Sequence, residues 1–204
     1  MPPAIFLDRD DTLIRRKGGL PTGDLGDPDL VELLPGAAEG VATLKYAGFP
    51  LAMVTNQGGV ARGKYTLDTV AAVNARVEQL LADIARLPLP IFSAIRVCPY
   101  HPQGVVPEYT REHPWRKPQP GMILDAAREL HADLARSWMI GDAERDVEAG
   151  IAAGCRTILV GDGSAFATYH AEFQAGAARN TKASFRAANL AEAAAIVLRE
   201  RAKG

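Results

Sequence analysis

The sequence has few cysteines, no long apolar segment and almost no net charge. Its 204 residues include two cysteines, Cys98 and Cys155, which are too few for a disulfide framework. No apolar run is long enough to span a bilayer. The formal net charge of −1 gives no overall attraction to nucleic acid or to an anionic membrane. We therefore expect neither a nucleic-acid partner nor a membrane partner.

The start of the chain also lacks a targeting pattern. The first residues, MPPAIFLDRDD, show no basic region followed by an apolar stretch and a small-residue cleavage site. Together with the low cysteine content, this favours a reducing cytoplasm as the location. The chain is 48% hydrophobic and 23% charged, as ordinary globular proteins are. Its length is sufficient for a full core, and we expect a single domain over residues 1–204.

Short apolar runs alternate with helical patterns along the chain. Runs typical of strands lie at residues 4–7, 51–55, 91–97, 138–142 and 157–160. Helical patterns lie at residues 36–49, 67–87, 120–130, 144–154 and 190–202. Residues 161–183 give no clear pattern. The alternation predicts an α/β fold, a Rossmann-like parallel sheet with helices on both faces.

Polar clusters follow three of the predicted strands. Ligands of such sheets bind beyond the carboxyl ends of the strands, where neighbouring ends meet. A cluster at one strand end can equally be a helix cap or a turn, but clusters at three equivalent ends favour one shared cleft. We expect the loops 15–35, 56–65 and 98–118 to line it. The clusters are Asp8-Arg9-Asp10, Thr55-Asn56-Gln57, and Asp142 with Glu144 and Asp146.

The residue types in these clusters suit phosphoryl transfer. Asp8 and Asp142 can bind Mg²⁺, which takes one or two carboxylates together with water and phosphate oxygens. Asp8 can attack phosphorus as a nucleophile. Asp10, two residues further on, can protonate the leaving oxygen and then deprotonate the attacking water. The side chains that can bind the phosphate are Thr55, Asn56 and Lys117.

Four motifs, in order, resemble those of the haloacid dehalogenase (HAD) superfamily of phosphatases: DRDDT, VTNQ, RKPQPGM and IGDAERD. Within it, FLDRD, TNQGGVARGKYT, CPYHPQG and RKPQPGM are similar to the subgroup of heptose-1,7-bisphosphate 7-phosphatases and histidinol-phosphatases. The resemblance covers roughly residues 4 to 160. It implies a Mg²⁺-dependent phosphomonoesterase that is monomeric, lacks a large cap domain and acts on a small phosphorylated metabolite.

The resemblance also assigns residue roles. Asp8 is the nucleophile that forms an aspartyl-phosphate, and Asp10 is the acid/base, with a backbone carbonyl that also binds Mg²⁺. Asp142 is a Mg²⁺ ligand. The roles of the other matching residues are to bind phosphate (Thr55, Asn56, Lys117), to contact the sugar end of the substrate (Arg62, Arg116) and to support the site (Asp146). Heptose bisphosphate, with removal of its 7-phosphate, other sugar phosphates and histidinol phosphate all remain open as substrates.

Two departures from the subgroup concern single positions. Asp11 stands where a glycine is usual, and we interpret it as a turn-capping acid without effect on activity. Ala143 replaces a lysine that is usually close to the metal and the phosphate, so the charge balance differs. The basic run Arg15-Arg16-Lys17 is interpreted as a solvated loop, although it lies on the side of the site and can meet a second phosphate.

The largest departure concerns a structural zinc loop, which in the subgroup has the form Cys-x-His followed by Cys-x-Cys. The matching positions here hold Cys98, Tyr100, His113 and Trp115. A structural zinc site needs four nitrogen or sulfur ligands, and tyrosine and tryptophan do not replace them. If His101 joins Cys98 and His113, the set has three donors and still needs a fourth, from Glu112 or water. We therefore predict that structural zinc is absent.

A different class of protein also combines paired acids, Thr or Ser and Lys on a parallel sheet, namely the receiver domain of signalling proteins. Such a domain keeps its acyl phosphate, whereas an enzyme hydrolyses it in successive cycles. The length of the chain and the Asp-x-Asp pair, which supplies a general acid, favour the enzyme.

Overall fold

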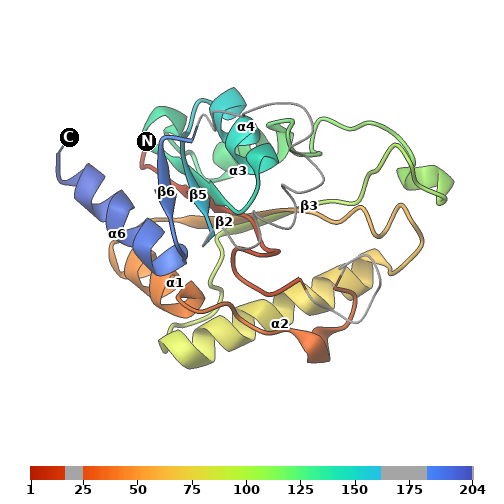
Figure 1. Ribbon diagram of the computed structural model, residues 1–204, viewed down its shortest axis with the longest axis horizontal. Coiled ribbons are helices and arrows are strands. Elements are labelled where there is room, and N and C mark those ends of the chain that lie inside the picture. The colour runs from red at the N-terminus through yellow and green to blue at the C-terminus, as the bar shows by residue number, and fades with distance from the viewer. Residues whose placement is uncertain (17–24, 162–182, 204) are drawn as a thin grey trace.

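The computed structural model describes residues 1–16, 25–161 and 183–203. Lys17, the middle of the 15–35 loop and most of the 161–183 stretch therefore lie outside the described residues. Within them, parallel strands form a sheet in the order β3-β2-β1-β4-β5-β6 (Figure 1). Its strands are β1 (Ile5–Leu7), β2 (Leu51–Asn56), β3 (Ala94–Cys98), β4 (Trp138–Gly141), β5 (Arg156–Val160) and β6 (Phe185–Ala187).

A helix lies between each two consecutive strands from β1 to β5, as a parallel sheet requires, and a further helix follows β6. Capping side chains start two of these helices. Thr66 accepts a hydrogen bond from the backbone N–H of Thr69, and Asn189 accepts one from that of Glu192. The helices are α1 (Ala37–Tyr46), α2 (Leu67–Ala85), α3 (Gly121–Glu129), α4 (Glu144–Ala153) and α6 (Leu190–Arg201). Short 3₁₀ turns lie at Pro28–Leu30, Pro107–Tyr109 and Leu134–Arg136.

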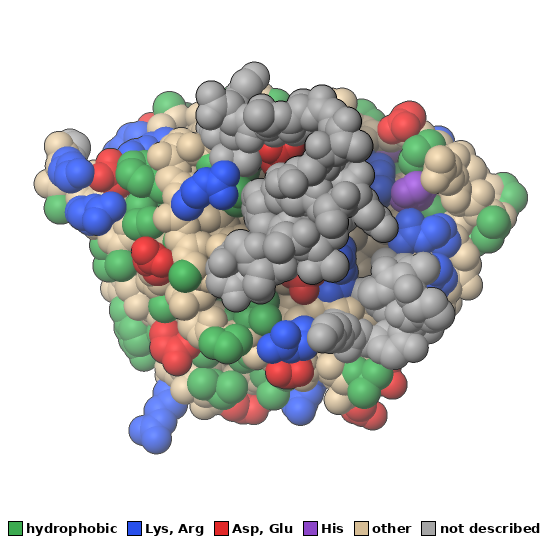
Figure 2. All heavy atoms as spheres, viewed as in Figure 1, with side chains coloured by type: hydrophobic (Ala, Val, Ile, Leu, Met, Phe, Trp, Pro, Cys, Tyr) green, Lys and Arg blue, Asp and Glu red, His purple; other side chains and the backbone are tan. Residues whose placement is uncertain are grey.

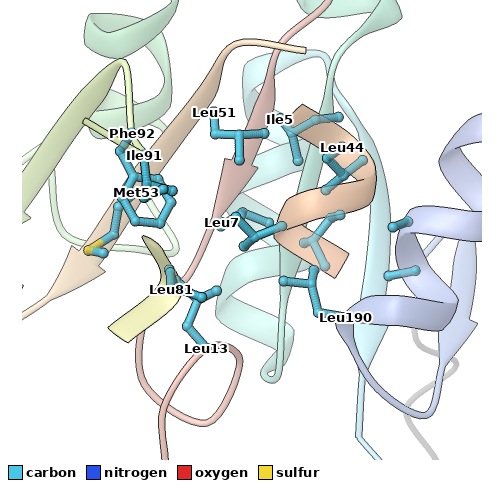
Figure 3. Packing of buried hydrophobic residues seen from close by; sticks show 14 of the residues in the cluster. Ile5, Leu7, Leu13, Leu44, Leu51, Met53, Leu81, Ile91, Phe92 and Leu190 are labelled. Atoms are coloured by element: carbon cyan, nitrogen blue, oxygen red, sulfur yellow. The ribbon is translucent and has the colours of Figure 1, made fainter. Parts of the chain in front are cut away.

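The two faces of the sheet bury separate apolar clusters. On one face, Leu7 of β1 and Met53 of β2 lie among residues of α1, α2 and α6, including Leu44, Leu81 and Leu190 (Figure 3). On the other face, residues of the alternate positions pack against α3 and α4 (Figure 1). The strands alternate between the two clusters because successive strand side chains point to opposite faces.

The position of β1 decides where a ligand can bind. The chain adds β2 and β3 on one side of β1, and then β4, β5 and β6 on the other. The strand order therefore reverses between β1 and β4. In open parallel sheets this reversal point, at the carboxyl ends of the strands, is the usual ligand site.

The predicted fold class is confirmed, with two differences in detail. β3 begins at Ala94 rather than at residue 91, and its preceding residues Ile91 and Phe92 are instead held by the Glu78 carboxylate, which accepts from both backbone N–H groups. β6 was not predicted, because Arg186 lies at its centre and its three residues form no apolar run. None of the described helices has the length and apolarity needed to span a bilayer.

Candidate active site

The strand register brings the three polar clusters together. Leu7, the last residue of β1, lies opposite Met53 of β2 and Ile140 of β4. The next residue, Asp8, donates its backbone N–H to the Ile140 carbonyl at 3.0 Å. The residues that follow Met53 and Ile140 therefore flank Asp8 from either side. The clusters are adjacent because β1 is central in the sheet.

Three carboxylates meet at this point. Oxygen atoms of Asp8, Asp142 and Asp146 lie within 4.8 Å of one another. Burial, with the neighbouring carboxylates of Asp146 and Asp8, raises the pKa of Asp142 to about 8. Burial also raises the pKa of Asp8 to about 6, although Lys117 lowers it. Without a bound metal ion, Asp8 and Asp142 are more easily protonated than isolated acids, which is the expected response to burial and crowded like charges.

The acidic group fits a hard divalent cation. One of its oxygens, Oδ1 of Asp142, is buried and accepts no hydrogen bond from the described residues. A buried carboxylate oxygen without a donor is costly in a closed protein, but it is a ready ligand for a metal ion. Oxygen donors with no nitrogen or sulfur partner suit Mg²⁺ rather than zinc.

Lys117 is the cation that the chain itself supplies. Its Nζ lies 2.8 Å from Oδ1 of Asp8 and 2.6 Å from Oδ1 of Asp146, and it donates to the Val54 carbonyl at 2.9 Å. Burial lowers the pKa of Lys117, but Asp146 and Asp8 raise it more, and the net shift is upward. The Lys117 ammonium therefore has a partner for each of its three N–H groups, and its acidic neighbours favour the charged form.

Asn56 determines where Lys117 lies. Its side-chain amide donates to the Lys117 carbonyl at 3.0 Å and accepts from the Lys117 backbone N–H at 3.1 Å. This pair of bonds joins the end of β2 to the loop before α3. The Asn56 side chain thus contacts the phosphate-binding candidate Lys117.

Asp146 reaches the group from the first turn of α4. Its Oδ2 accepts from the backbone N–H of Ala143 at 3.1 Å, which orients the carboxylate at the start of the helix. Gly141 makes this approach possible, because a Cβ at that position would lie 2.5 Å from Cγ of Asp146. A larger residue at the end of β4 would push α4 away from the acidic group.

Asp10 is held by a different set of partners. Arg9, which is fully buried, donates from Nε to Oδ1 of Asp10 at 2.9 Å and from Nη2 to Oδ2 at 3.3 Å. The third bond of the guanidinium, from Nη1, goes to Oδ1 of Asn74 on α2 at 2.9 Å. Gln57 donates to Oδ2 of Asp10 at 2.9 Å. The Asp10 side chain has one orientation because these donors are themselves fixed.

A cavity of about 130 Å³ opens next to these residues. Asp8 and Asp10 contribute acidic groups to its wall, and the loops after β1, β2 and β3 each contribute an arginine. Figure 2 shows Lys and Arg side chains gathered beside a histidine on the right half of this face. Four arginines line the cavity: Arg16, Arg62, Arg116 and Arg145. A cavity with acids in its wall and several guanidinium groups suits a metal-bound, multiply charged anion.

Comparison with known proteins agrees with this geometry. The chain is 40% identical over 164 residues to a D-glycero-beta-D-manno-heptose-1,7-bisphosphate 7-phosphatase from Mesorhizobium japonicum, covering 80% of this chain and 71% of the relative. It is also 40% identical over 162 residues to the Escherichia coli K12 enzyme of the same name, covering 79% and 80%. A family model described as HAD-hydrolase-like matches residues 114–193. The chain belongs to the HAD-like phosphatases.

A solved structure extends this similarity over almost the whole chain. It is the D,D-heptose 1,7-bisphosphate phosphatase from B. bronchiseptica, complexed with magnesium and phosphate. The two chains are 30% identical with a TM-score of 0.76, over 97% of this chain and 99% of the other. The fold and the family of this phosphatase are thereby established.

The residues predicted from the sequence fall into two groups. Five of them, Asp8, Asp10, Asn56, Arg62 and Arg116, line the cavity. The others lie behind its wall: Lys117 and Asp146 are buried beside Asp8, Asp142 completes the acidic group, and Thr55 is linked through Gln57 to Asp10.

Three residues that shape the site received no role from the sequence, although two of them belong to the polar clusters. Arg9 lies between the two motif acids, Gln57 follows the predicted phosphate-binding pair, and Arg145 precedes Asp146. Arg145 also lies 4.0 Å from Oδ1 of Asp142. The available signal was their adjacency to motif residues, and for Arg145 also the nearby loss of a lysine at position 143.

Aromatic packing holds the loop in which the subgroup has its zinc site. The His113 ring stacks on Tyr100 with centroids 4.0 Å apart, and Trp115 meets His113 edge-on at 6.1 Å. The Arg111 guanidinium covers Tyr100 at 4.4 Å. Nδ1 of His113 accepts from the Trp115 backbone N–H at 3.1 Å and is occupied by that bond. Burial raises the pKa of the Cys98 thiol, which disfavours the thiolate that zinc would need.

Asp11 has the turn-capping role expected for it. Its φ of 57° lies in the left-handed region, which glycine adopts without strain and which aspartate tolerates better than most residues. Its Oδ1 accepts from the backbone N–H of Arg16 at 3.0 Å, and its Oδ2 pairs with Nε of Arg16 at 3.2 Å. Asp11 therefore closes the turn after β1 and directs Arg16, which lines the cavity.

Proposed function

We propose that this HAD-like phosphatase is a Mg²⁺-dependent phosphomonoesterase that acts through an aspartyl-phosphate on Asp8. The observation that carries the proposal is the group of Asp8, Asp142 and Asp146 at the reversal point of the sheet, with the Lys117 ammonium bound to Asp8 and Asp146. The magnesium and phosphate of the B. bronchiseptica structure support it.

Asp8 has one oxygen suited to attack. The Lys117 ammonium and the Arg9 backbone N–H both contact Oδ1, at 2.8 Å each. We assign the nucleophilic role to Oδ2, which forms the bond to phosphorus while the ester P–O bond breaks. Lys117 offsets the negative charge that gathers when an anionic carboxylate approaches an anionic phosphate. Thr55 and Asn56 are the further phosphate-binding candidates, Asn56 also through the position it gives Lys117.

The carboxylates of Asp8 and Asp142, with the backbone carbonyl of Asp10, are the groups we propose to hold Mg²⁺, and Asp146 supports them. When bound, the ion supplies charge neutralisation and orientation of the phosphate. Asp10 donates a proton to the leaving oxygen, and in the second half of the cycle accepts one from the water that attacks the aspartyl-phosphate. That attack releases inorganic phosphate and restores Asp8.

For the substrate, we propose D-glycero-D-manno-heptose 1,7-bisphosphate, with loss of its 7-phosphate. The named relatives at 40% identity support this choice. The arginines in the cavity wall also support it, because a bisphosphate carries a second anionic group beyond the one that is cleaved. We assign Arg62 and Arg116 to the sugar end of the substrate. We further propose that one domain, residues 1–204, works as a cytoplasmic monomer.

The test measures phosphate release from heptose 1,7-bisphosphate, hexose phosphates and histidinol phosphate, with Mg²⁺ and with chelator. We expect heptose bisphosphate to have the highest kcat/KM and chelator to stop turnover. Asp8→Asn should abolish turnover without changing the thermal unfolding of the protein by more than a few degrees. Full activity in that variant, or in metal-free buffer, would contradict the mechanism, and a preference for histidinol phosphate would contradict the substrate.

A further inference from the structure

Gln57 lies at the centre of a buried hydrogen-bond network that joins two parts of the proposed site. Its side chain is almost inaccessible, with 1% of the residue exposed. Nε2 donates to Oδ2 of Asp10 at 2.9 Å and to Oγ1 of Thr55 at 2.8 Å. Oε1 accepts from the hydroxyl of Tyr65 at 2.9 Å, and the backbone N–H donates to the Cys98 carbonyl at 2.8 Å.

The chemistry of these partners allows only one orientation of the amide. Oδ2 of Asp10 already accepts from Nη2 of Arg9, so the Gln57 atom that faces it is the donor, the amide nitrogen. The nitrogen has two hydrogens, and the second one is directed at Thr55. The amide oxygen then faces Tyr65, whose hydroxyl can donate. Exchanging nitrogen and oxygen would place two acceptors against each other at Asp10.

Tyr65 keeps the amide in this orientation. Its ring lies against the turn that follows β2, where Gly59 leaves room for it: a Cβ on Gly59 would lie 2.4 Å from the Tyr65 hydroxyl oxygen. Gly59, the second glycine of the TNQGG stretch, thus has a role beyond the turn itself. It lets an aromatic ring reach the Gln57 side chain.

The bond to Thr55 has a consequence for the hydroxyl hydrogen. Since Oγ1 of Thr55 accepts from Gln57, the Thr55 hydrogen must point to another acceptor. A threonine whose oxygen already accepts a strong donor is oriented to donate, which is what binding a phosphate oxygen requires. The same amide group therefore influences both Asp10 and Thr55.

We propose that Gln57 is a positioning residue that sets the acid/base Asp10 and the phosphate-binding Thr55 at the same time. This inference rests on the proposed function, because it needs the roles given there to Asp10 and Thr55. Arg9 holds the plane of the Asp10 carboxylate through two bonds, and Gln57 adds the bond that couples this carboxylate to the phosphate-binding side. Losing Gln57 should disturb proton transfer and phosphate binding together.

Two substitutions of Gln57 test the inference. Gln57→Met keeps the length of the side chain and removes both N–H donors. Gln57→Glu also removes them, but adds an acceptor that captures the Thr55 hydrogen and a negative charge beside Asp10. Tyr65→Phe is a milder third variant that leaves Gln57 in place and removes the hydroxyl that orients it. Gln79→Met is the matched control, since exposed Gln79 also donates to a carboxylate, that of Asp83, at 2.8 Å.

The assay compares a hexose phosphate, whose leaving alkoxide needs a proton, with an aryl phosphate, whose leaving group does not. Misplaced catalytic groups cost on the order of 10²-fold in rate. We expect Gln57→Met to lose about that much kcat on the hexose phosphate and about tenfold less on the aryl phosphate. Inhibition by inorganic phosphate should weaken in the order wild type, Gln57→Met, Gln57→Glu. Tyr65→Phe should show the same substrate pattern with a smaller loss, and Gln79→Met should match the wild type.

Equal losses on both substrates, with unchanged phosphate inhibition in variants that unfold at the wild-type temperature, would overturn the inference and reduce Gln57 to a packing residue. Should Gln57→Met fold poorly, Tyr65→Phe decides by the same criterion. A wild-type chain without turnover in Mg²⁺ would instead overturn the proposed function, and this inference with it. Wild-type turnover with a uniform loss in the variants overturns the inference alone.

Discussion

Replacing Lys117 by methionine tests the electrostatics of the site apart from turnover. Methionine retains most of the apolar stem and removes the ammonium, which lies 2.8 Å from Asp8 and 2.6 Å from Asp146. The variant therefore leaves the acidic group of Asp8, Asp142 and Asp146 without its internal cation. The Val54 carbonyl also loses the hydrogen bond from Lys117.

The size of the effect follows from burial. The Lys117 and Asp8 side chains are 1% and 3% exposed, so water screens their interaction very little. Breaking a buried ion pair by removing one partner costs about 3–5 kcal/mol, because the remaining charge is buried alone. We expect this loss in the free energy of unfolding at pH 8 without metal.

The loss should depend on pH in a defined direction. Lys117 stabilises the fold through Asp8 only while Asp8 is ionised, and the pKa of Asp8 is already raised to about 6 with Lys117 present. Without Lys117 that pKa rises further, since the cation lowers it. At pH 5 Asp8 takes up a proton and no longer needs a cation. The cost of Lys117→Met should then be smaller than at pH 8, and the part that remains comes from the lost ion pair with buried Asp146 and from lost packing.

Urea unfolding of wild type and variant in chelator, at pH 5 and pH 8, measures the difference. Lys203→Met is the matched control, because it breaks an exposed pair with Glu200 at 2.6 Å. Exposed pairs contribute about 0–1 kcal/mol, so the control should change little at either pH. An equal loss for Lys117→Met at both pH values would refute the electrostatic reasoning and leave only packing.

Three further predictions concern metal and charge. Burial raises the pKa of Asp8 to about 6 and that of Asp142 to about 8, so the metal-free protein loses stability as the pH rises to these values and the two groups ionise. Mg²⁺ binds the ionised carboxylates and should therefore raise Tm more at pH 8 than at pH 5. An equal rise at both pH values would contradict this prediction. Arg145→Met should raise KM about tenfold with little change in Tm, because Arg145 lines the cavity and a hydrogen bond to a charged group contributes about 1.5–3 kcal/mol to binding. The control Arg128→Met, at an exposed position outside the cavity, should leave KM unchanged. Cys98→Ser should cost about 1 kcal/mol in urea unfolding, and elemental analysis should find no zinc; one equivalent of zinc, lost in the variant, would contradict the prediction.

The sequence predicted the parallel sheet and the meeting of its strand ends because both depend on local patterns. Each apolar run that ends in Asp8, Thr55 or Asp142 can be recognised as a strand from its own residues, and a parallel sheet places the ends of such strands on one edge. The turn-capping role of Asp11 was also readable, since aspartate is among the residues that tolerate a left-handed backbone.

The bonds within the site could not be predicted in the same way. Lys117 was recognised as a cation near the phosphate, but its contact with Asp146 depends on how closely α4 approaches β4, which Gly141 decides. The contacts of Gln57 with Asp10 and Thr55 join residues from two strand ends. Such contacts depend on side-chain directions in three dimensions, and no periodic pattern in the sequence records them.

The central position of β1 also has a consequence for the order in which the chain assembles. β1 is made first, yet it pairs with β4, whose first residue is Trp138. Until that residue has left the ribosome, β1 has only β2 beside it and its other edge is unpaired. Asp8 likewise has no ion pair until Lys117, which also pairs with Asp146, has been synthesised. A nascent chain that stops before β4 therefore exposes the unpaired backbone groups of β1 and the unpaired carboxylate of Asp8. A fragment of residues 1–130 should aggregate through this strand edge unless the remaining residues are supplied as a separate chain.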